Sequence, residues 1–97
     1  MTTQQLQNLC DELTEVSPPP TRPLGINAPI IGAGRWIAVR FGGGAYAIRA
    51  EYNTTDGKKI TVKMENELRG FPNGLVSAIR FTIELAKSHR HYWYTTE

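Results

Sequence analysis

The sequence predicts an α+β domain in which a three-stranded antiparallel sheet carries an amphipathic helix. Three short runs between residues 35 and 66 alternate apolar and polar side chains, the period-two pattern of half-buried strands. A longer run over residues 74–90 repeats apolar residues with helical spacing. A shorter amphipathic run precedes them at residues 3–16. We therefore expect one domain over residues 1–97: an N-terminal helix, the three-stranded sheet, and a C-terminal amphipathic helix packed on one sheet face.

The composition fits one small domain. The 97 residues are 40% hydrophobic and 21% charged, enough to bury roughly 60–65% of the surface of the unfolded chain. No run of about 18 apolar residues is present, nor a basic start followed by an apolar core. We therefore expect no membrane contact and no signal peptide, with the cytoplasm as the default compartment. The single cysteine, Cys10, excludes an internal disulfide, and we interpret it as a small buried hydrophobe.

The N-terminal third divides into a helix and a connector. In the helix, Thr2 and Gln5 could form a capping box. Residues 17–34 form a proline-rich connector, because its prolines exclude both a helix and a central strand. We interpret it as a stiff spacer that carries the first helix across the sheet, while a proline-rich docking motif over residues 20–23 remains an alternative. Four apolar residues in its second half are expected to pack against the core: Leu24, Ile26, Ile30 and Ile31.

In each strand run, one set of alternate residues is expected to face the core. Glycines 42–44 and the Asp56-Gly57 pair favour tight turns between the runs, because glycine adopts positive φ without a steric penalty. The expected core positions are Ile37, Val39 and Phe41 in the first run, Tyr46, Ile48, Ala50 and Tyr52 in the second, and Ile60, Val62 and Met64 in the third.

The C-terminal helix is more apolar than one sheet requires. Its polar residues Ser77, Arg80, Glu84 and Lys87 fall on one narrow stripe, which leaves an apolar arc roughly 220° wide on a wheel of about 100° per residue. A helix resting on a sheet needs little more than ~100°. We expect the N-terminal segment, an aromatic tail at residues 91–97 or a second copy of the chain to cover the remainder. Before the helix, we expect Asn73 to cap it and Phe71 to pin the connection to the core.

The residue types that carry catalysis form no recognisable set. His89 and His91 have no cysteine or third histidine nearby, and no serine stands in a nucleophile-elbow setting. Residues 32–34, Gly-Ala-Gly, open like a dinucleotide fingerprint, but the third glycine is missing and a strand follows instead of a helix. We therefore expect a protein that is not an enzyme, with no metal and no cofactor.

The outward sheet face is expected to be basic. Basic side chains beside an aromatic on an open sheet can track phosphates and stack a base. The residues expected to form such a nucleic-acid face are Trp36, Arg40, Arg49, Lys58, Lys59 and Lys63, beside the anions Glu51 and Glu65.

Two family resemblances bear on this face. The order strand, strand, Asp56-Gly57-Lys58-Lys59 turn, strand, helix is similar to the three-stranded DNA-binding domains of plant ethylene-response factors and of phage integrase arms, although their dense arginine pattern is absent. The order helix, three strands, helix resembles double-stranded-RNA-binding domains, but Asn73-Gly74-Leu75-Val76 replaces their basic cluster.

Two functional hypotheses follow. In the first, favoured by the wide apolar helix, the protein is a non-enzymatic protein-binding module that acts by docking as an adaptor, regulator or inhibitor and forms a homodimer. Small regulators from phages and mobile elements are often of this type. In the second, it is a small nucleic-acid-binding domain that uses the basic sheet face. The residues expected to carry partner binding or self-association in the first hypothesis are Leu75, Ile79, Phe81, Ile83, Leu85, Tyr92 and Trp93.

Overall fold

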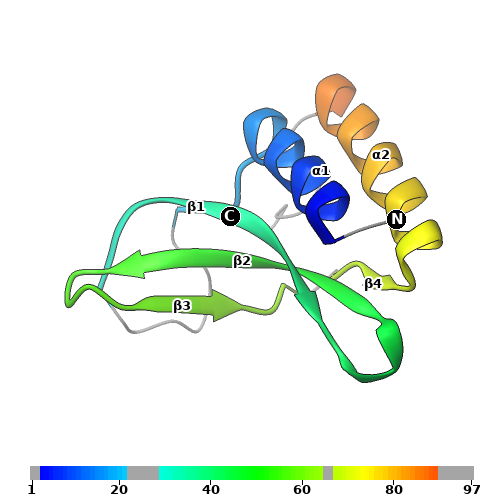
Figure 1. Ribbon diagram of the computed structural model, residues 1–97. Coiled ribbons are helices and arrows are strands. Elements are labelled where there is room, and N and C mark those ends of the chain that lie inside the picture. Colours follow the sequence, from blue (N-terminus) through cyan, green and yellow to red (C-terminus); the bar gives the residue numbers. More distant parts are fainter. Residues whose placement is uncertain (1–2, 22–28, 65–66, 90–97) are drawn as a thin grey trace.

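The computed structural model describes residues 3–21, 29–64 and 67–89 and has the predicted α+β fold (Figure 1). The first helix spans the predicted residues, whereas the first strand begins five residues earlier than predicted and the second helix two residues earlier. Neither described helix is long and apolar enough to cross a bilayer. In chain order the elements are α1 (Thr3–Val16), β1 (Ile30–Arg40), a 3-10 turn η1 (Gly42–Gly44), β2 (Tyr46–Thr54), β3 (Lys59–Val62), β4 (Arg69–Gly70) and α2 (Pro72–His89).

Strand β2 is the centre of the sheet. β1 pairs antiparallel with it along one edge, and β3 and β4 both pair antiparallel with it along the other. β3 corresponds to the third predicted strand, whereas β4 lies beyond the predicted sheet of residues 35–66 and was not predicted. Both predicted turns are present: Gly43 and Gly44 have φ of 78° and 86°, and Gly57 has φ of 83°, values that glycine adopts readily.

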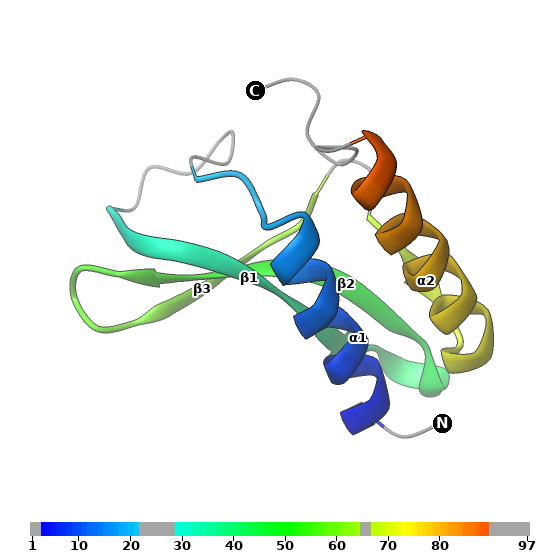
Figure 2. The ribbon, with the colours of Figure 1, turned by 90° about the horizontal axis from the view of Figure 1, so that it is seen from above.

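Both helices lie on the same face of the sheet, where they run side by side (Figures 1 and 2). No described helix covers the opposite face, which we call the open face. The core lies between the helices and the sheet, and its side chains come from α1, α2, β1, β2 and β3. Its buried members are Leu6, Cys10, Leu13, Trp36, Tyr46, Ile48, Ala50, Tyr52, Val62, Leu75, Ile79 and Ile83.

Strand β1 faces the opposite way from the prediction. Trp36 pairs with Ala50, and residues directly opposite in an antiparallel pair share a face. Trp36 is therefore in the core and 1% exposed, whereas Ile37 and Val39 lie on the open face and are half-buried. The prediction failed because both alternating sets in this strand are largely apolar, and a shift of one residue exchanges the faces. Burying the indole removes the larger apolar area from water.

Helix α1 covers the outer edge of β1 with side chains. The Thr14 hydroxyl accepts a hydrogen bond from the Trp36 backbone N–H at 3.0 Å. The Gln7 amide donates to the Trp36 carbonyl oxygen at 3.2 Å and accepts from the Ala38 N–H at 3.3 Å. Gln7 thus behaves like a peptide group of one more strand. Because these backbone groups are occupied, this part of the edge cannot pair with a strand of another molecule.

The start of the proline-rich connector packs against the core. Ser17, Pro19 and Pro20 are buried. The Trp36 indole N–H donates to the Ser17 carbonyl oxygen at 2.7 Å, and the Tyr52 hydroxyl donates to the Pro20 carbonyl oxygen at 2.6 Å. These contacts fit a spacer that is anchored to the sheet by two aromatic side chains.

The remaining connector expectations have mixed outcomes. Ile30 packs against the core, but Ile31 is 51% exposed, contrary to prediction. Leu24 and Ile26 lie outside the described residues, as do Arg22 and Pro23 of the alternative docking motif and Thr2 of the capping box.

Helix α2 begins at a proline. Pro72 has no N–H and a fixed φ, which suit the first helical position. The Leu75 N–H donates to the Phe71 carbonyl oxygen at 2.9 Å, so Phe71 rather than Asn73 occupies the cap position. The expectation that Phe71 pins this connection to the core is wrong, because its side chain is 65% exposed. Leu75, one turn later, fills the core instead.

Candidate functional site

The inner side of α2 is used within the chain. Leu75, Ile79 and Ile83 are at most 2% exposed, because α1 packs beside α2 and shares one hydrophobic core with it. The expectation that these three residues form a contact surface is therefore wrong. The N-terminal segment, one of the three expected covers, accounts for this part of the apolar arc. Tyr92 and Trp93 lie outside the described residues.

A second apolar stripe remains on the outer side of α2. Phe81 is 64% exposed and Leu85 is half-buried. Spacings of three and four residues connect them to further small or apolar residues along the same side. Phe71, Gly74 and Ser88 are exposed, and Ala78 is half-buried. We call these six positions the outer stripe: Phe71, Gly74, Ala78, Phe81, Leu85 and Ser88.

The predicted basic residues do not all share one face. Arg49 and Lys59 lie on the open face, since they alternate with the core residues of β2 and β3. Exposed Lys63 directly follows β3, and Lys58 lies in the preceding turn. Arg40 pairs with Tyr46 and so belongs to the helix-covered face. Trp36 is buried, so its expected role in stacking a base is wrong.

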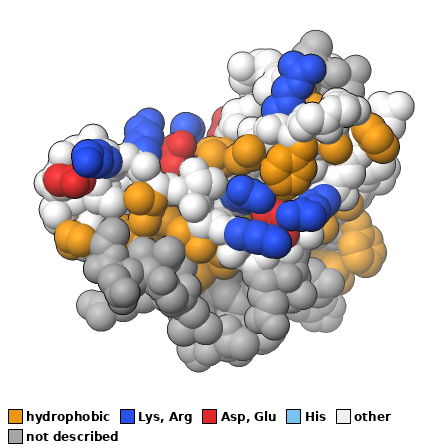
Figure 3. Space-filling model, turned by 90° about the horizontal axis from the view of Figure 1, so that it is seen from below, with side chains coloured by type: hydrophobic (Ala, Val, Ile, Leu, Met, Phe, Trp, Pro, Cys, Tyr) orange, Lys and Arg blue, Asp and Glu red, His pale blue; other side chains and the backbone are white. Residues whose placement is uncertain are grey.

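Two arginines and a glutamate form the most organised cluster on the open face. Glu67 accepts hydrogen bonds from Nε of Arg49 at 2.7 Å and from Nε of Arg69 at 2.6 Å, one on each carboxylate oxygen. Both guanidinium groups also lie over the Phe41 ring, 5.1 Å and 5.3 Å from its centroid. Figure 3 shows Lys and Arg side chains gathered around a carboxylate on this side of the molecule.

Three members of this cluster were not predicted as site residues. Phe41 was expected in the core, and Glu67 and Arg69 were assigned no role. The available signal was the alternation of Glu67 with Arg69, which sets both side chains on one side of an extended segment. β4 has only two residues, too few for a period-two pattern to be recognised in sequence.

The buried Glu67 carboxylate stays ionised at neutral pH. Its side chain is 3% exposed, and burial by itself would raise its pKa. The hydrogen bonds and positive charges of Arg69 and Arg49 outweigh this effect and hold the pKa of Glu67 below its usual value. Two positive groups therefore share one negative group, which leaves a net positive charge on the cluster.

This lowered pKa makes the stability of the fold depend on pH. Because the folded pKa lies below the unfolded value, Glu67 stabilises the fold above about pH 4.5 and loses this contribution as the pH falls through its folded pKa. We expect Glu67→Gln to lower the free energy of unfolding by about 1–2 kcal/mol at pH 7. The difference from the wild type should shrink at acid pH in urea titrations between pH 3 and 7.

A matched control is Glu51→Gln, which removes the carboxylate from the more exposed Arg35–Glu51 pair at 2.9 Å. We expect a loss below about 1 kcal/mol there. A Glu67→Gln effect that stays constant across this pH range would contradict the assignment.

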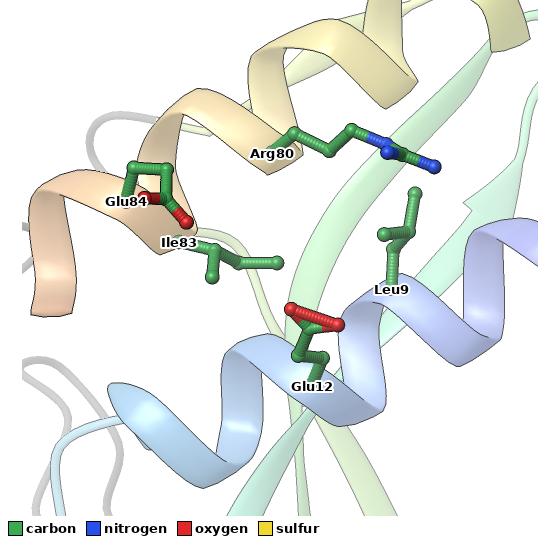
Figure 4. Close-up of a pocket in the computed structure, with 5 residues that line it drawn as sticks. All are labelled: Leu9, Glu12, Arg80, Ile83 and Glu84. Carbon is green, nitrogen blue, oxygen red and sulfur yellow. The ribbon is translucent and has the colours of Figure 1, made fainter.

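An open groove of about 340 Å³ lies between the two helices (Figure 4). Leu9 and Glu12 of α1 and Arg80, Ile83 and Glu84 of α2 line it. Arg80 extends toward Leu9, and Ile83 points into the space between the helices. Two carboxylates and one guanidinium on an apolar floor form neither a nucleophile with its base nor a metal-ligand set, so we assign no chemistry to this groove.

Reactive groups in the described residues are few. Burial and the neighbouring Asp11 carboxylate raise the pKa of Cys10 to about 12, which keeps it a neutral thiol. No group of three or more His, Cys, Asp or Glu side chains in residues 3–21, 29–64 and 67–89 could hold a metal ion. His89 is the last described residue, and His91 lies beyond it.

The fold and its surfaces define a small α+β domain with two exposed features, the outer stripe of α2 and a basic open face. Comparison of the chain with protein-family models, curated protein sequences and solved structures finds no match. We therefore infer function from the geometry and chemistry of the described residues.

Proposed function

We propose that this protein is a non-enzymatic docking module that binds an amphipathic helix on the outer stripe of α2, and that its first partner is a second copy of itself. The supporting observation is Phe81, a large aromatic residue that is 64% exposed in the middle of a regular helix. Exposed aromatics in apolar stripes are typical of binding surfaces. We expect the protein to act in the cytoplasm, a compartment that suits a fold without disulfides.

The spacing of the outer stripe favours another helix as the partner. Its positions follow one another at intervals of three and four residues, the repeat that forms a seam between two packed helices. From Phe71 to Ser88 the stripe covers roughly 25 Å of helix length at about 1.5 Å per residue. Small residues at Gly74 and Ala78 allow a second helix to approach closely.

The order of side-chain sizes favours a second copy in antiparallel orientation. A twofold axis midway between Ala78 and Phe81 sets Phe81 of each copy against Ala78 of the other. The same axis pairs Leu85 with Gly74 and Phe71 with Ser88. Every large side chain then meets a small one, which a twofold interface requires of a self-complementary patch. A parallel arrangement would instead place Phe81 against Phe81.

Two surfaces of the fold support this choice of interface. The edge of β1 is occupied by Gln7 and Thr14 of α1, which disfavours pairing between strands of two copies. The inner side of α2 is closed by α1. An interface made by the outer stripe alone would be smaller than a standard interface, which buries roughly 800 Å² per partner. We therefore expect an association that depends on concentration in the micromolar range.

The test is the oligomeric state of substituted proteins. By sedimentation equilibrium, we expect the wild type to dimerise and Phe81→Glu to weaken dimerisation at least about 30-fold, because a buried charge replaces a central aromatic anchor. Ile31→Glu is the matched control, since Ile31 is also an exposed apolar residue but lies in β1. It should dimerise as the wild type does.

Disulfide trapping tests the orientation, and the buried Cys10 thiol should not interfere. A mixture of Gly74→Cys and Leu85→Cys proteins should form a cross-linked pair. Gly74→Cys alone should not, because its two copies would lie roughly 17 Å apart along the helices. A wild-type protein that stays monomeric up to about 100 μM would refute self-association. Efficient cross-linking of Gly74→Cys alone would refute the antiparallel arrangement.

A further inference from the structure

We propose that the open face of the sheet binds the phosphate backbone of a nucleic acid, with Arg49 and Arg69 as its central contacts. This inference is independent of self-association, because the open face and α2 lie on opposite sides of the sheet (Figure 1). Four properties of the face support it: the two guanidinium groups are held in place, the positive charge extends along the sheet, the cations outnumber the anions, and the helix-covered side is less basic.

The two guanidinium groups are held in place, but only part of their hydrogen-bond donors are engaged by described residues. Each donates its Nε–H to Glu67, and each lies over the Phe41 ring. Their terminal Nη groups make no hydrogen bond to any described residue. A guanidinium held in place loses little freedom when it binds an anion, and its planar N–H groups match the oxygens of a phosphate.

The positive charge continues along the sheet in the direction of β3. Lys59 lies opposite Asn53, and Arg69 lies opposite Ala47 on the same edge of β2. Lys59 and Arg69 are therefore six positions apart along β2, which corresponds to roughly 20 Å. Exposed Lys63 lies in sequence between the ends. Neither lysine has a carboxylate within ion-pair distance among the described residues, as the salt bridges of the sheet involve arginines.

The charges on this face are strongly unbalanced. Its described cations are Arg35, Arg49, Lys59, Lys63 and Arg69, and its described anions are Glu51 and Glu67. Glu65, which was predicted on this face, lies outside the described residues.

The helix-covered side of the molecule is less basic. Its described anions are Asp11, Glu12, Glu15 and Glu84, and its described cations are Arg40, Arg80 and Lys87. A charge distribution of this kind orients an approaching polyanion toward the open face.

A nucleic-acid backbone fits this face better than an acidic peptide does. The cations are distributed along the sheet, from Lys59 to Arg69, instead of being gathered around one pocket, and the phosphates of a nucleic-acid strand are distributed in a similar way. Phe41, the aromatic ring of the Glu67 cluster, is covered by the two guanidinium groups. It therefore offers no pocket for an apolar anchor, the feature that concentrates binding energy in a protein interface.

The test is fluorescence anisotropy with labelled 20-nucleotide single-stranded DNA, 20-base-pair DNA and 20-base-pair RNA. We expect binding at low salt to at least one of them, with a log–log salt slope of about −3 to −4 if four phosphates are contacted. Lys59→Gln and Lys63→Gln, which leave the Glu67 cluster intact, should each weaken binding about threefold or more and reduce the slope by about 1. Arg49→Gln should weaken it more.

The Glu67→Gln variant tests whether nucleic-acid binding depends on the positions of Arg49 and Arg69 or on the net charge of the face alone. This substitution makes the face more positive, so a face that attracts polyanions by net charge alone would bind more tightly. If Glu67 acts as a positioning residue, binding becomes weaker despite the added charge, while circular dichroism shows an intact fold. Arg80→Gln is the control for the loss of one positive charge elsewhere, since Arg80 is exposed on α2, and it should change affinity less than twofold.

Three outcomes would overturn the proposal: no binding of any of the three probes at 50 mM salt, equal effects of Arg80→Gln and Arg49→Gln, or competition by polyglutamate as effective as competition by an oligonucleotide of equal charge. The Phe81→Glu protein should still bind the probes at each open face. A failure of self-association is thereby distinguished from a failure of this site.

Discussion

Trp36→Ala is expected to lower the free energy of unfolding by about 3–5 kcal/mol. The side chain is 1% exposed and lies in the core between the sheet and α1. Its indole N–H also satisfies the Ser17 carbonyl oxygen at 2.7 Å, and that acceptor would lose its partner. A domain of this size has a total stability of about 5–15 kcal/mol, so urea unfolding should show a protein close to the limit of folding.

Two further variants separate the contributions. Trp36→Phe keeps an aromatic ring in the core but removes the N–H donor, so we expect a smaller loss of about 1–3 kcal/mol. Phe81→Ala truncates another large aromatic that is 64% exposed, and we expect a change within about 0.5 kcal/mol. If Trp36→Ala were as mild as Phe81→Ala, Trp36 would lie at the surface, as the sequence had indicated.

The contrast between β1 and β2 shows what a strand pattern can determine. In β2 the residues between Tyr46, Ile48 and Tyr52 include Arg49 and Glu51, so only one face could enter the core, and the prediction was correct. In β1, Ile37 and Val39 compete with Trp36 and Ala38. Alternation locates such a strand but does not orient it, because either face is apolar enough to be buried. The choice is made by tertiary contacts with α1, which lies far away in the sequence.

The same limit applies to the two surfaces proposed for binding. The wide apolar arc of α2 was evident from the sequence, but its division into an inner side and an outer stripe depends on where α1 packs. Leu75 and Phe81 are equally apolar in the sequence, yet one is 1% and the other 64% exposed. On the open face, Arg49 was predicted, whereas Glu67 and Arg69 were not, because only the pairing of the two-residue β4 with β2 brings them beside it.

Gly34→Ala is expected to lower the free energy of unfolding by about 3 kcal/mol, a large effect for the addition of one methyl group. A Cβ at this position would lie 2.5 Å, 2.8 Å and 3.0 Å from three carbons of the Tyr52 ring. That ring cannot easily move, since it is buried and its hydroxyl donates to the Pro20 carbonyl oxygen. Gly34 does not have a positive φ, so the cost would be steric rather than conformational.

Gly42→Ala is the matched control, because a Cβ there meets no atom within 4 Å and its φ is not positive. Its free energy of unfolding should stay within about 1 kcal/mol of the wild type. If the close contact with Tyr52 is the cause, Gly34→Ala should cost much less when Tyr52→Leu is already present, and urea titrations of the double-mutant cycle measure that coupling. Additive effects would contradict this explanation. Coupling would show that residues 32–34, which open like a nucleotide-binding fingerprint, contain glycine at residue 34 because an aromatic ring from the neighbouring strand occupies the space of a side chain.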